Sequence, residues 1–275
     1  MNPHLTPSAG PIRMFGSLWK NRLLITQMTK REVIGRYRGS VMGLTWSFFN
    51  PILMLAVYTF VFSEIFKARW VGVDTSQGGF AILVFVGMIV HGLFAECANR
   101  APSLIMSNSN YVKKVVFPLE ILPVITLGSA LFHSCISLLV LLIVQLLIAH
   151  TMYWSALLFP LILVPLILGT LGISWFLASL GVFLRDVGQV ITVLTTVLMF
   201  LSPVLYPVAA LPEVYRPWLQ LNPLTYVIEE SRNVLLYGNM PDWGSLSAAI
   251  LISIIIAVVG FWFFQKTRKG FADVI

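Results

Sequence analysis

Long apolar stretches separated by short polar segments dominate the chain. A helix needs roughly 20 residues to cross the hydrocarbon core of a bilayer, which is about 30 Å thick. The stretches that meet this length are residues 41–66, 80–99, 119–149, 155–183, 188–208 and 245–264. None of them alternates between polar and apolar residues as membrane β-strands do. The pattern therefore predicts an all-α integral membrane protein with six transmembrane helices.

A second kind of helical pattern precedes the first span. The apolar residues that recur at helical spacing there are Ile12, Phe15, Leu18, Trp19 and Leu23, opposite Arg13, Ser17 and Lys20. Such an amphipathic helix lies in the headgroup plane of a membrane. We therefore divide the chain into residues 1–40, a cytoplasmic tail with this interfacial helix, and residues 41–275, the membrane domain.

The segment between the fifth and sixth spans predicts re-entrant half-helices at the outer mouth. Asn222 is a good N-cap, Pro223 suits the first helical position, and Gly238 suits the position after the last turn. Its apolar face comprises Leu224, Val227, Ile228, Val234 and Leu235, whereas Glu229, Glu230, Arg232 and Asn233 are expected elsewhere. Pro203 and Pro207 break the fifth span just before this helix.

Composition supports a lipid-embedded protein. Hydrophobic residues make up 58% of the 275 residues and charged residues 11%, against about 25% charged residues in soluble domains. With the N-terminus inside, the cytoplasmic segments hold 14 of the 18 Lys and Arg residues and the outer segments 4. This distribution follows the positive-inside rule. It predicts two cytoplasmic termini and explains the net charge of +7 without a nucleic-acid partner.

The densest group of cations runs directly into the first span and contains Arg31, Arg36 and Arg38. Gly35, Gly39 and Gly43 are interleaved with it at intervals of four, and small residues at this spacing let helices approach closely. We expect these glycines to pack against a neighbouring helix, a second copy or a passing substrate. Enforcement of membrane topology is the alternative role for the arginines.

The cytoplasmic segment between spans two and three predicts a short helix. Its SNSN sequence offers N-cap residues, and Pro118 ends it. We interpret it as a docking surface that contains Asn110, Tyr111, Val112, Lys113 and Lys114. The other cytoplasmic hairpin carries Arg185 and Asp186. An interfacial topology signal remains the alternative.

Catalytic patterns are absent from the sequence: we find no nucleotide-binding motif, no paired carboxylates and no metal-ligand spacing. We therefore expect neither an enzyme nor a cofactor in this chain. His91, Glu96 and His133 are polar residues inside the spans. A charge at mid-bilayer costs about 2.5–3.5 kcal/mol, so such residues usually face protein or water. We favour structural roles for them, with Arg100 as the partner of Glu96, and leave a transport role open.

Aromatic residues crowd the first and fifth spans. Those that we single out are Trp46, Phe49, Tyr58, Phe200 and Tyr206. Aromatic side chains form belts at membrane interfaces, but rings within a span also suit the lining of a conduit, because sugars stack on them. The residues alone leave both interpretations open.

Five segments, in order, carry a family resemblance: GRYRGSVMGLTWSFFNPILMLAVYTFVFS, SNYVKKVVFPLEILPV, LRDVGQV, SPVLYP and LNPLTYVIEESRNVLLYG. Together they resemble the permease subunit of type-2 ABC exporters. Within that family they are similar to the branch that exports lipid-linked polysaccharide, such as O-antigen, capsule or teichoic acid. The match extends from about residue 13 over nearly the whole chain.

The resemblance implies a homodimer in the inner membrane, with two copies of a separate ATPase subunit that binds ATP and Mg²⁺. Spans one and five, with the aromatic residues above, would line the route. The segment around Tyr111 and the turn at Arg185 would contact the ATPase. Arg31, Arg36 and Arg38 would hold the pyrophosphate of a polyprenyl-linked polysaccharide.

Other transporter classes fit less well. An exporter of a drug or small lipid stays possible within the same family. An ion-coupled secondary transporter predicts paired intramembrane acids or inverted repeats with broken helices, and we find neither. A membrane-embedded transferase would need catalytic acids or a metal site.

Overall fold

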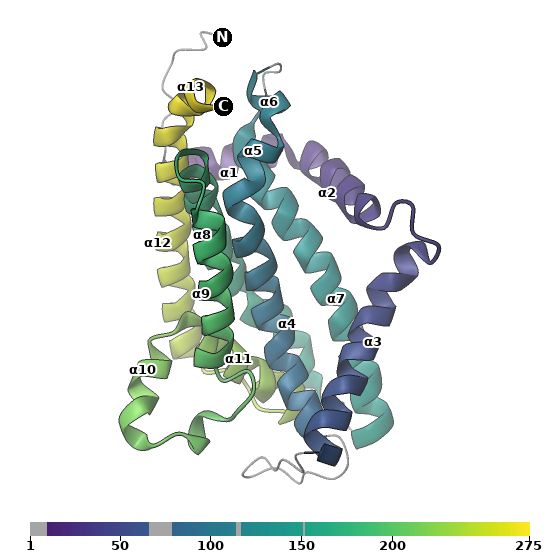
Figure 1. Cartoon of the computed structure of the whole chain (residues 1–275). Coiled ribbons are helices and arrows are strands. Elements are labelled where there is room, and N and C mark those ends of the chain that lie inside the picture. Colours follow the sequence, from purple (N-terminus) through teal and green to yellow (C-terminus); the bar gives the residue numbers. More distant parts are fainter. Residues whose placement is uncertain (1–9, 66–78, 114–116, 151) are drawn as a thin grey trace.

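The computed structural model describes residues 10–65, 79–113, 117–150 and 152–275, and these residues form an all-helical bundle (Figure 1). Its long helices are α3 (Trp46–Thr59), α4 (Gly79–Arg100), α7 (Leu122–Ala149), α8 (Phe159–Phe183), α9 (Val187–Leu201) and α12 (Trp243–Thr267). Its shorter helices are α1 (Pro11–Lys20), α2 (Arg22–Arg36), α5 (Leu104–Ser107), α6 (Ser109–Lys113), α10 (Arg216–Gln220), α11 (Pro223–Leu236) and α13 (Phe271–Val274). A π-helical turn, Phe60–Ile65, extends α3.

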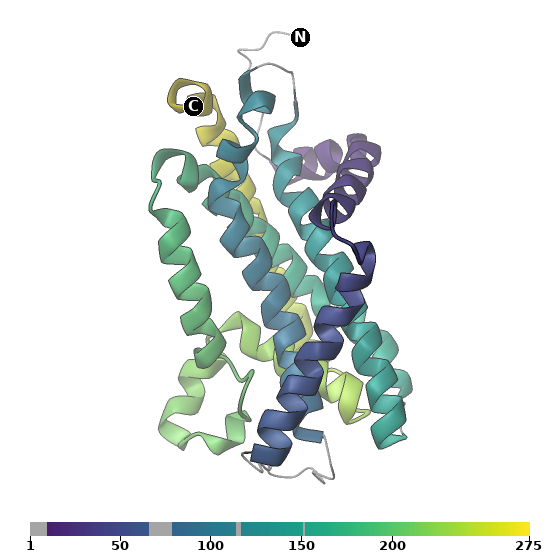
Figure 2. The ribbon, with the colours of Figure 1, turned by 45° about the vertical axis from the view of Figure 1, so that its right-hand side comes forward.

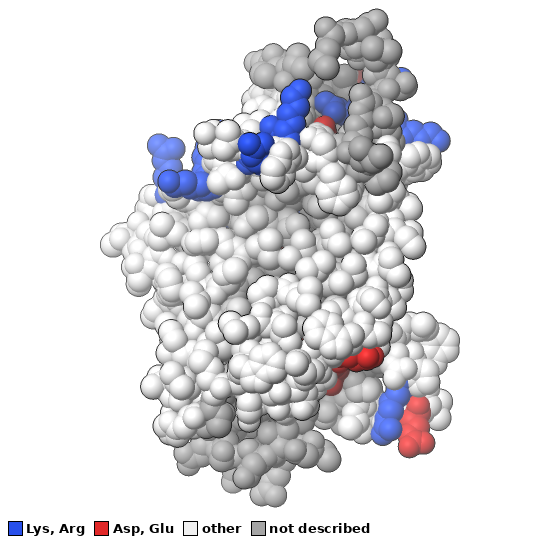
Figure 3. Space-filling model, turned by 180° about the vertical axis from the view of Figure 1, so that it is seen from behind, with Lys and Arg blue, Asp and Glu red and all other residues white. Residues whose placement is uncertain are grey.

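Helices α1, α2, α6 and α13 lie at one end of the bundle, here named the upper end, and α10 and α11 lie toward the lower end (Figure 1). In the space-filling view, Lys and Arg gather at the upper end (Figure 3). A wide charge-free band separates them from the charged residues near the lower end (Figure 3). This arrangement suits a protein whose middle lies in hydrocarbon.

Five of the predicted spans are confirmed as helices long and apolar enough to cross a membrane: Gly43–Phe62, Gly79–Ser107, Leu119–Ile148, Trp154–Phe183 and Trp243–Val274. The predicted fifth span is shorter than expected. Helix α9 has 15 residues and ends at Leu201, which gives a length of about 22 Å at 1.5 Å per residue. Ser202 leaves the helix with an extended backbone, ψ 154°, because the following Pro203 disfavours the helical conformation.

Helices α8 and α12 make the closest contact between two long helices in the described chain. A Cβ atom added to Gly260 would lie 2.0 Å from the carbonyl oxygen of Gly172. A Cβ added to Gly172 would lie 2.4 Å from the carbonyl oxygen of Ile256. Only glycine at both positions permits this crossing, since backbone atoms cannot move aside as a flexible side chain can.

The predicted N-terminal amphipathic helix is present but consists of two helices that meet at Asn21. Phe15, Trp19 and Leu23 are 63%, 72% and 70% exposed, as expected for side chains that face a membrane surface. Met14, which the sequence pattern omits, is buried against the bundle together with the partly buried Leu18. The side chain of Ile12 lies outside the described residues.

The structure contradicts the predicted glycine stripe within this chain. Gly39 and Gly43 have φ angles of +86° and +53° and lie between α2 and α3, so they do not continue a helix with Gly35. A Cβ added to any of the three would meet nothing within 4 Å. Helix α2 instead approaches α7 at Gly128, where an added Cβ would lie 2.9 Å from Thr29 Cγ2. Packing of the stripe against a second copy stays a prediction.

Helix α11 confirms the caps that the sequence predicts. The Asn222 side chain accepts a hydrogen bond from the Leu224 amide at 3.0 Å, Pro223 is the first helical residue, and Gly238 has φ +72°. The predicted apolar face is buried along its whole length. The sequence pattern placed Arg232 away from the apolar face. This expectation is wrong, because the Arg232 side chain is buried with that face and only 1% exposed.

Candidate functional site

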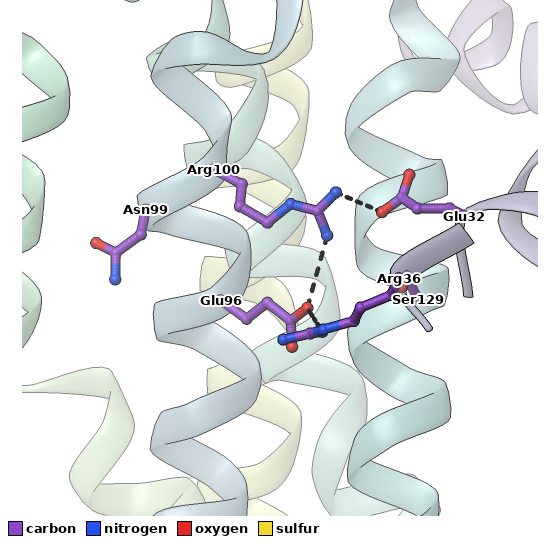
Figure 4. A pocket seen from close by; sticks show the side chains of 6 residues that line it. All are labelled: Glu32, Arg36, Glu96, Asn99, Arg100 and Ser129. Atoms are coloured by element: carbon purple, nitrogen blue, oxygen red, sulfur yellow. Dashed lines mark hydrogen bonds and ion pairs between the residues drawn. The ribbon is translucent and has the colours of Figure 1, made fainter. Parts of the chain in front are cut away.

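A cleft at the upper half of the bundle holds four charged residues that link α2 to α4. Arg36 Nη1 donates to Glu96 Oε1 at 2.6 Å, and Arg100 Nη2 lies 2.6 Å from Glu32 Oε1. Arg100 also lies 3.6 Å from Glu96 Oε1, as its spacing of four residues on a helix predicts. Figure 4 shows these pairs converging from the two helices. We name Glu32, Arg36, Glu96 and Arg100 the charge cluster.

The charge cluster lines a cavity of about 600 Å³, together with Asn99 and Ser129. A second cavity of about 350 Å³ shares Arg36 and Glu96 with the first. Its walls combine polar residues, such as Ser47, Asn50 and Ser137, with apolar ones, such as Met54, Phe85 and Ile89. The two cavities therefore form one cleft with a charged part and a mixed polar and apolar part, which suits an amphiphile.

His133 of α7 lies beside the charge cluster. Its Nδ1 atom lies 3.3 Å from Arg36 Nη1 and 4.0 Å from Glu96 Oε2. The ring of Tyr37 packs against it edge-on, with centroids 6.0 Å apart. Burial raises the pKa of the Tyr37 hydroxyl, while Arg36 lowers this pKa and Glu96 raises it. His133 thus lies in the wall of the cleft.

The three arginines predicted to hold a head group have different surroundings. Arg36 lies in the cleft, half exposed, and is already paired with Glu96. Arg31 donates to the hydroxyl of Tyr111 on α6 at 3.0 Å, away from the charge cluster. Arg38 is exposed in the turn after α2. The sequence pattern predicted Arg100 as the partner of Glu96, which the structure confirms, but it did not place Glu32 or Arg36 with them.

The aromatic residues predicted to line a route form two separate groups within one chain, one on α3 and one at the end of α9. Tyr58 lines the smaller cavity. Trp46 and Phe49 contact each other, with ring centroids 5.4 Å apart. The Tyr206 hydroxyl donates to the Phe200 carbonyl at 2.8 Å. Helices α3 and α9 lie on opposite sides of α4 (Figures 1 and 2), so α4 separates the two groups within one chain.

The predicted short helix is present as α6, which begins at Ser109, and its docking role stays a prediction. The Tyr111 ring stacks on Phe117, with centroids 4.4 Å apart and planes 13° apart. Asn110 is exposed and Val112 half-buried. The side chain of Lys113 and the whole of Lys114 lie outside the described residues. Arg185 and Asp186 form an exposed turn between α8 and α9.

Sequence reasoning missed a buried junction at Glu120. The Glu120 carboxylate accepts from Ser17 Oγ of α1 at 2.8 Å and from Arg268 Nη1 at 2.8 Å. Its backbone oxygen accepts from Trp175 Nε1 at 2.9 Å. Three segments far apart in sequence therefore meet at this one residue, which follows α6. No local spacing predicts such a contact.

Arg232 connects α11 to α4 and to the irregular segment after α9. Its guanidinium donates to the carbonyl oxygens of Leu83 and Val204 at 3.1 and 3.0 Å and pairs with Glu229 at 2.7 Å. His91 makes a similar link, since its Nε2 lies 3.0 Å from the Thr195 carbonyl oxygen. This contact supports the structural role expected for His91.

Replacing Arg232 with methionine is expected to lower the free energy of unfolding by about 1–3 kcal/mol, the range for leaving a buried acceptor without its partner, because the partly exposed Glu229 can turn to solvent. Methionine keeps the apolar stem but leaves the Val204 oxygen without this donor. Thermal unfolding in detergent measures the loss. Glu229→Gln, which keeps an acceptor, should cost much less. An unchanged transition in the methionine variant would contradict this role.

Two arginines, Arg36 and Arg100, supply the cationic donors of the cleft. Among the described residues, no three His, Cys, Asp or Glu side chains lie close enough to hold a metal ion. Arginine forms bidentate hydrogen bonds with phosphate or carboxylate groups. Two arginines that face one cavity therefore suit an anionic group. Glu96 and Glu32 compete with such a group for the guanidinium donors.

Comparison with known proteins gives matches over most of the chain. The ABC-2 type transporter family model matches residues 24–236. The O-antigen export system permease protein RfbA of Myxococcus xanthus is 27% identical over 266 residues, which cover 96% of this chain and 100% of that protein. A Klebsiella pneumoniae protein with the same description is 24% identical over 256 residues, 92% of this chain and 95% of its own. The polysialic acid transport protein KpsM of Escherichia coli is 22% identical over 252 residues, 90% and 95% of the two chains.

Proposed function

Because the chain belongs to the ABC-2 type transporter family, we propose that it is the permease subunit of an ATP-driven exporter of lipid-linked polysaccharide. The observation that carries this proposal is the similarity to O-antigen and polysialic acid export proteins over 90–96% of the chain. The apolar helices and the charge-free band support a multi-pass protein of the inner membrane. The substrate would be a glycan of the O-antigen, capsule or teichoic-acid type.

In this proposal the upper end of the bundle faces the cytoplasm. The gathering of Lys and Arg at that end supports this orientation. The active complex is a homodimer with two ATPase subunits, which bind ATP and Mg²⁺. Because α3 and α9 lie on opposite sides of α4 in one chain, the route would form where these helices of two copies face each other, lined by the aromatic residues of both.

The cleft would receive the phosphate-bearing head group of the lipid carrier. Arg36 and Arg100 supply donors for a diphosphate, and the half-exposed Arg36 lies where the cleft meets solvent. An incoming diphosphate would replace Glu96 as the partner of Arg36, and Glu96 would keep Arg100 as its own partner. Arg38 would add positive charge at the cleft mouth. The amphiphilic lining of the smaller cavity supports a ligand with a charged head and an apolar chain.

The upper end would also carry the contact with the ATPase. Helix α6 and the turn at Arg185 and Asp186 supply it, and the hydrogen bond from Arg31 to Tyr111 joins α6 to α2. Movement of α6 during ATP hydrolysis would therefore reach the helix that carries Arg36. This connection supports a coupling role for α6 and its neighbours.

The test is purification of this chain from its native cell in mild detergent, followed by identification of bound protein and glycan. The proposal predicts a stoichiometric ABC ATPase subunit and a polyprenyl-linked polysaccharide. Recovery with the ATPase and a drug-like or small-lipid cargo would keep the family and change the substrate. A chain that purifies alone and still transports would contradict the proposal.

A further inference from the structure

Helix α13 lies at the upper end between the two segments assigned to ATPase contact. It packs beside α6 and beside the end of α8, and Figure 1 shows α13 and α6 at the same end. Phe271, fully buried, contacts the rings of Phe183 and Phe264, with centroids 6.0 and 5.5 Å apart. Phe183 directly precedes the 184–186 turn. The helix therefore bridges α6 and that turn.

Arg268 fixes the start of this segment. Its Nη1 donates to the carboxylate of Glu120 and its Nη2 to the carbonyl oxygen of Phe117, at 2.8 and 3.0 Å. Phe117 in turn stacks on Tyr111 of α6. A continuous series of contacts thus runs from Arg268 to α6, so both ends of the bridge are anchored to elements of the proposed docking surface.

The outer side of the bridge is open. Ala272, Asp273 and Val274 are exposed, and Val274 retains 49% of its surface. Because Phe271 and Arg268 hold the segment from below, these three side chains are presented on a fixed support. Another protein can therefore reach these side chains without displacing Phe271 or Arg268.

Helix α6 is too small to form a stable protein–protein interface without additional surface. Helix α6 has five residues and is about 7.5 Å long. A stable interface between two proteins buries about 800 Å² on each partner, contributed by roughly 20–30 residues. A five-residue helix and a three-residue turn do not provide this area, whereas a bridge that joins them makes one continuous surface.

We propose that residues 268–274 form the middle of the surface that binds the ATPase subunit, with Arg268 and Glu120 as positioning residues. This inference rests on the proposed function. The choice of partner follows from continuity with both segments assigned to the ATPase. The exposed pair Asp273 and Val274 makes the contact, and the Arg268–Glu120 ion pair holds it in place.

The experiment uses the full chain co-expressed with the tagged ABC ATPase subunit of the same export system. The double variant Asp273→Lys/Val274→Glu should weaken ATPase binding by roughly tenfold or more, since like charges and desolvated polar groups oppose association. Glu213→Lys/Val214→Glu is the matched control, because it makes the same changes in an exposed pair at the lower end. The control should bind as the wild type does.

Positioning is tested separately with Arg268→Gln and Glu120→Gln. Both should weaken ATPase binding while the exposed surface residues stay unchanged, and Arg268→Lys should restore part of it. Size-exclusion profiles and thermal transitions of the purified chain show whether each variant is folded. A role in folding alone would lower the transition and leave the affinity of the folded fraction for the ATPase unchanged, which would overturn the positioning role.

The outcomes separate this inference from the proposed function. If Asn110→Lys on α6 weakens ATPase binding and the double variant at 273 and 274 does not, the bridge is overturned and the α6 contact stands. If neither variant changes ATPase binding, the bridge and the α6 contact are both contradicted.

Discussion

Replacing Arg36 and Arg38 with glutamine is expected to reduce polysaccharide export roughly 10- to 100-fold, because hydrogen bonds to charged groups contribute about 1.5–3 kcal/mol each. Arg36 is the cleft cation that α2 supplies, and Arg38 is exposed just beyond it. Glu96 keeps Arg100 as a partner in this variant, so no carboxylate is left without a cation. The amount of polysaccharide on the cell surface measures the effect.

Topology is the competing explanation for these arginines. The double variant Lys20→Gln/Lys30→Gln removes two cations from α1 and α2 without touching the cleft, since both lysines are exposed and neither lines either cavity. A head-group role predicts normal export in this control and normal ATPase binding in both variants. Equal losses of export in the two double variants would leave topology as the explanation.

Gly260→Ala is expected to have the largest effect on stability. The added methyl group would lie 2.0 Å from the oxygen, 2.7 Å from the carbon and 2.9 Å from the Cα atom of Gly172. No rotamer relieves these contacts, because alanine has none and the opposing atoms are backbone. Overpacking typically costs about 1–3 kcal/mol and occasionally more, and we expect the upper part of this range or beyond.

Gly169→Ala is the matched control for this crossing. It places the same methyl group on the other helix of the α8–α12 pair, where the nearest atom is Ser253 Oγ of α12 at an ordinary 3.6 Å. We expect Gly260→Ala to lose the monodisperse peak in detergent and Gly169→Ala to keep it. A wild-type thermal transition for Gly260→Ala would show that α8 and α12 do not cross this closely.

Local patterns predicted the parts of the fold that depend on neighbouring residues. The length of each apolar stretch predicted the long helices, because a lipid solvent requires backbone hydrogen bonds within each segment. The caps of α11 were predicted because Asn222, Pro223 and Gly238 act on adjacent backbone groups. The length of the predicted fifth span was overestimated. Pro203 is a local signal that by itself restricts Ser202 to an extended backbone.

Contacts between distant segments could not be predicted in the same way. The glycines at 35, 39 and 43 have the spacing of a packing motif, yet Gly172 and Gly260 make the close crossing and are 88 positions apart. The partners of Arg232 and Glu120 lie on other helices, so their burial depends on the tertiary fold. For the cleft, the one usable sequence signal was the presence of polar residues inside the apolar spans. It singled out Glu96 and His133.

The most direct test of the proposed function is ATP-dependent movement of polysaccharide in a defined membrane. The purified chain and its ABC ATPase subunit are reconstituted into proteoliposomes that carry lipid-linked polysaccharide from the native cell, and an added lectin reports how much glycan remains accessible. We predict that accessibility changes only when both proteins and hydrolysable ATP are present, and that the Arg36→Gln/Arg38→Gln variant is impaired. Movement without ATP or without the ATPase, or movement driven by an ion gradient alone, would contradict an ATP-driven exporter.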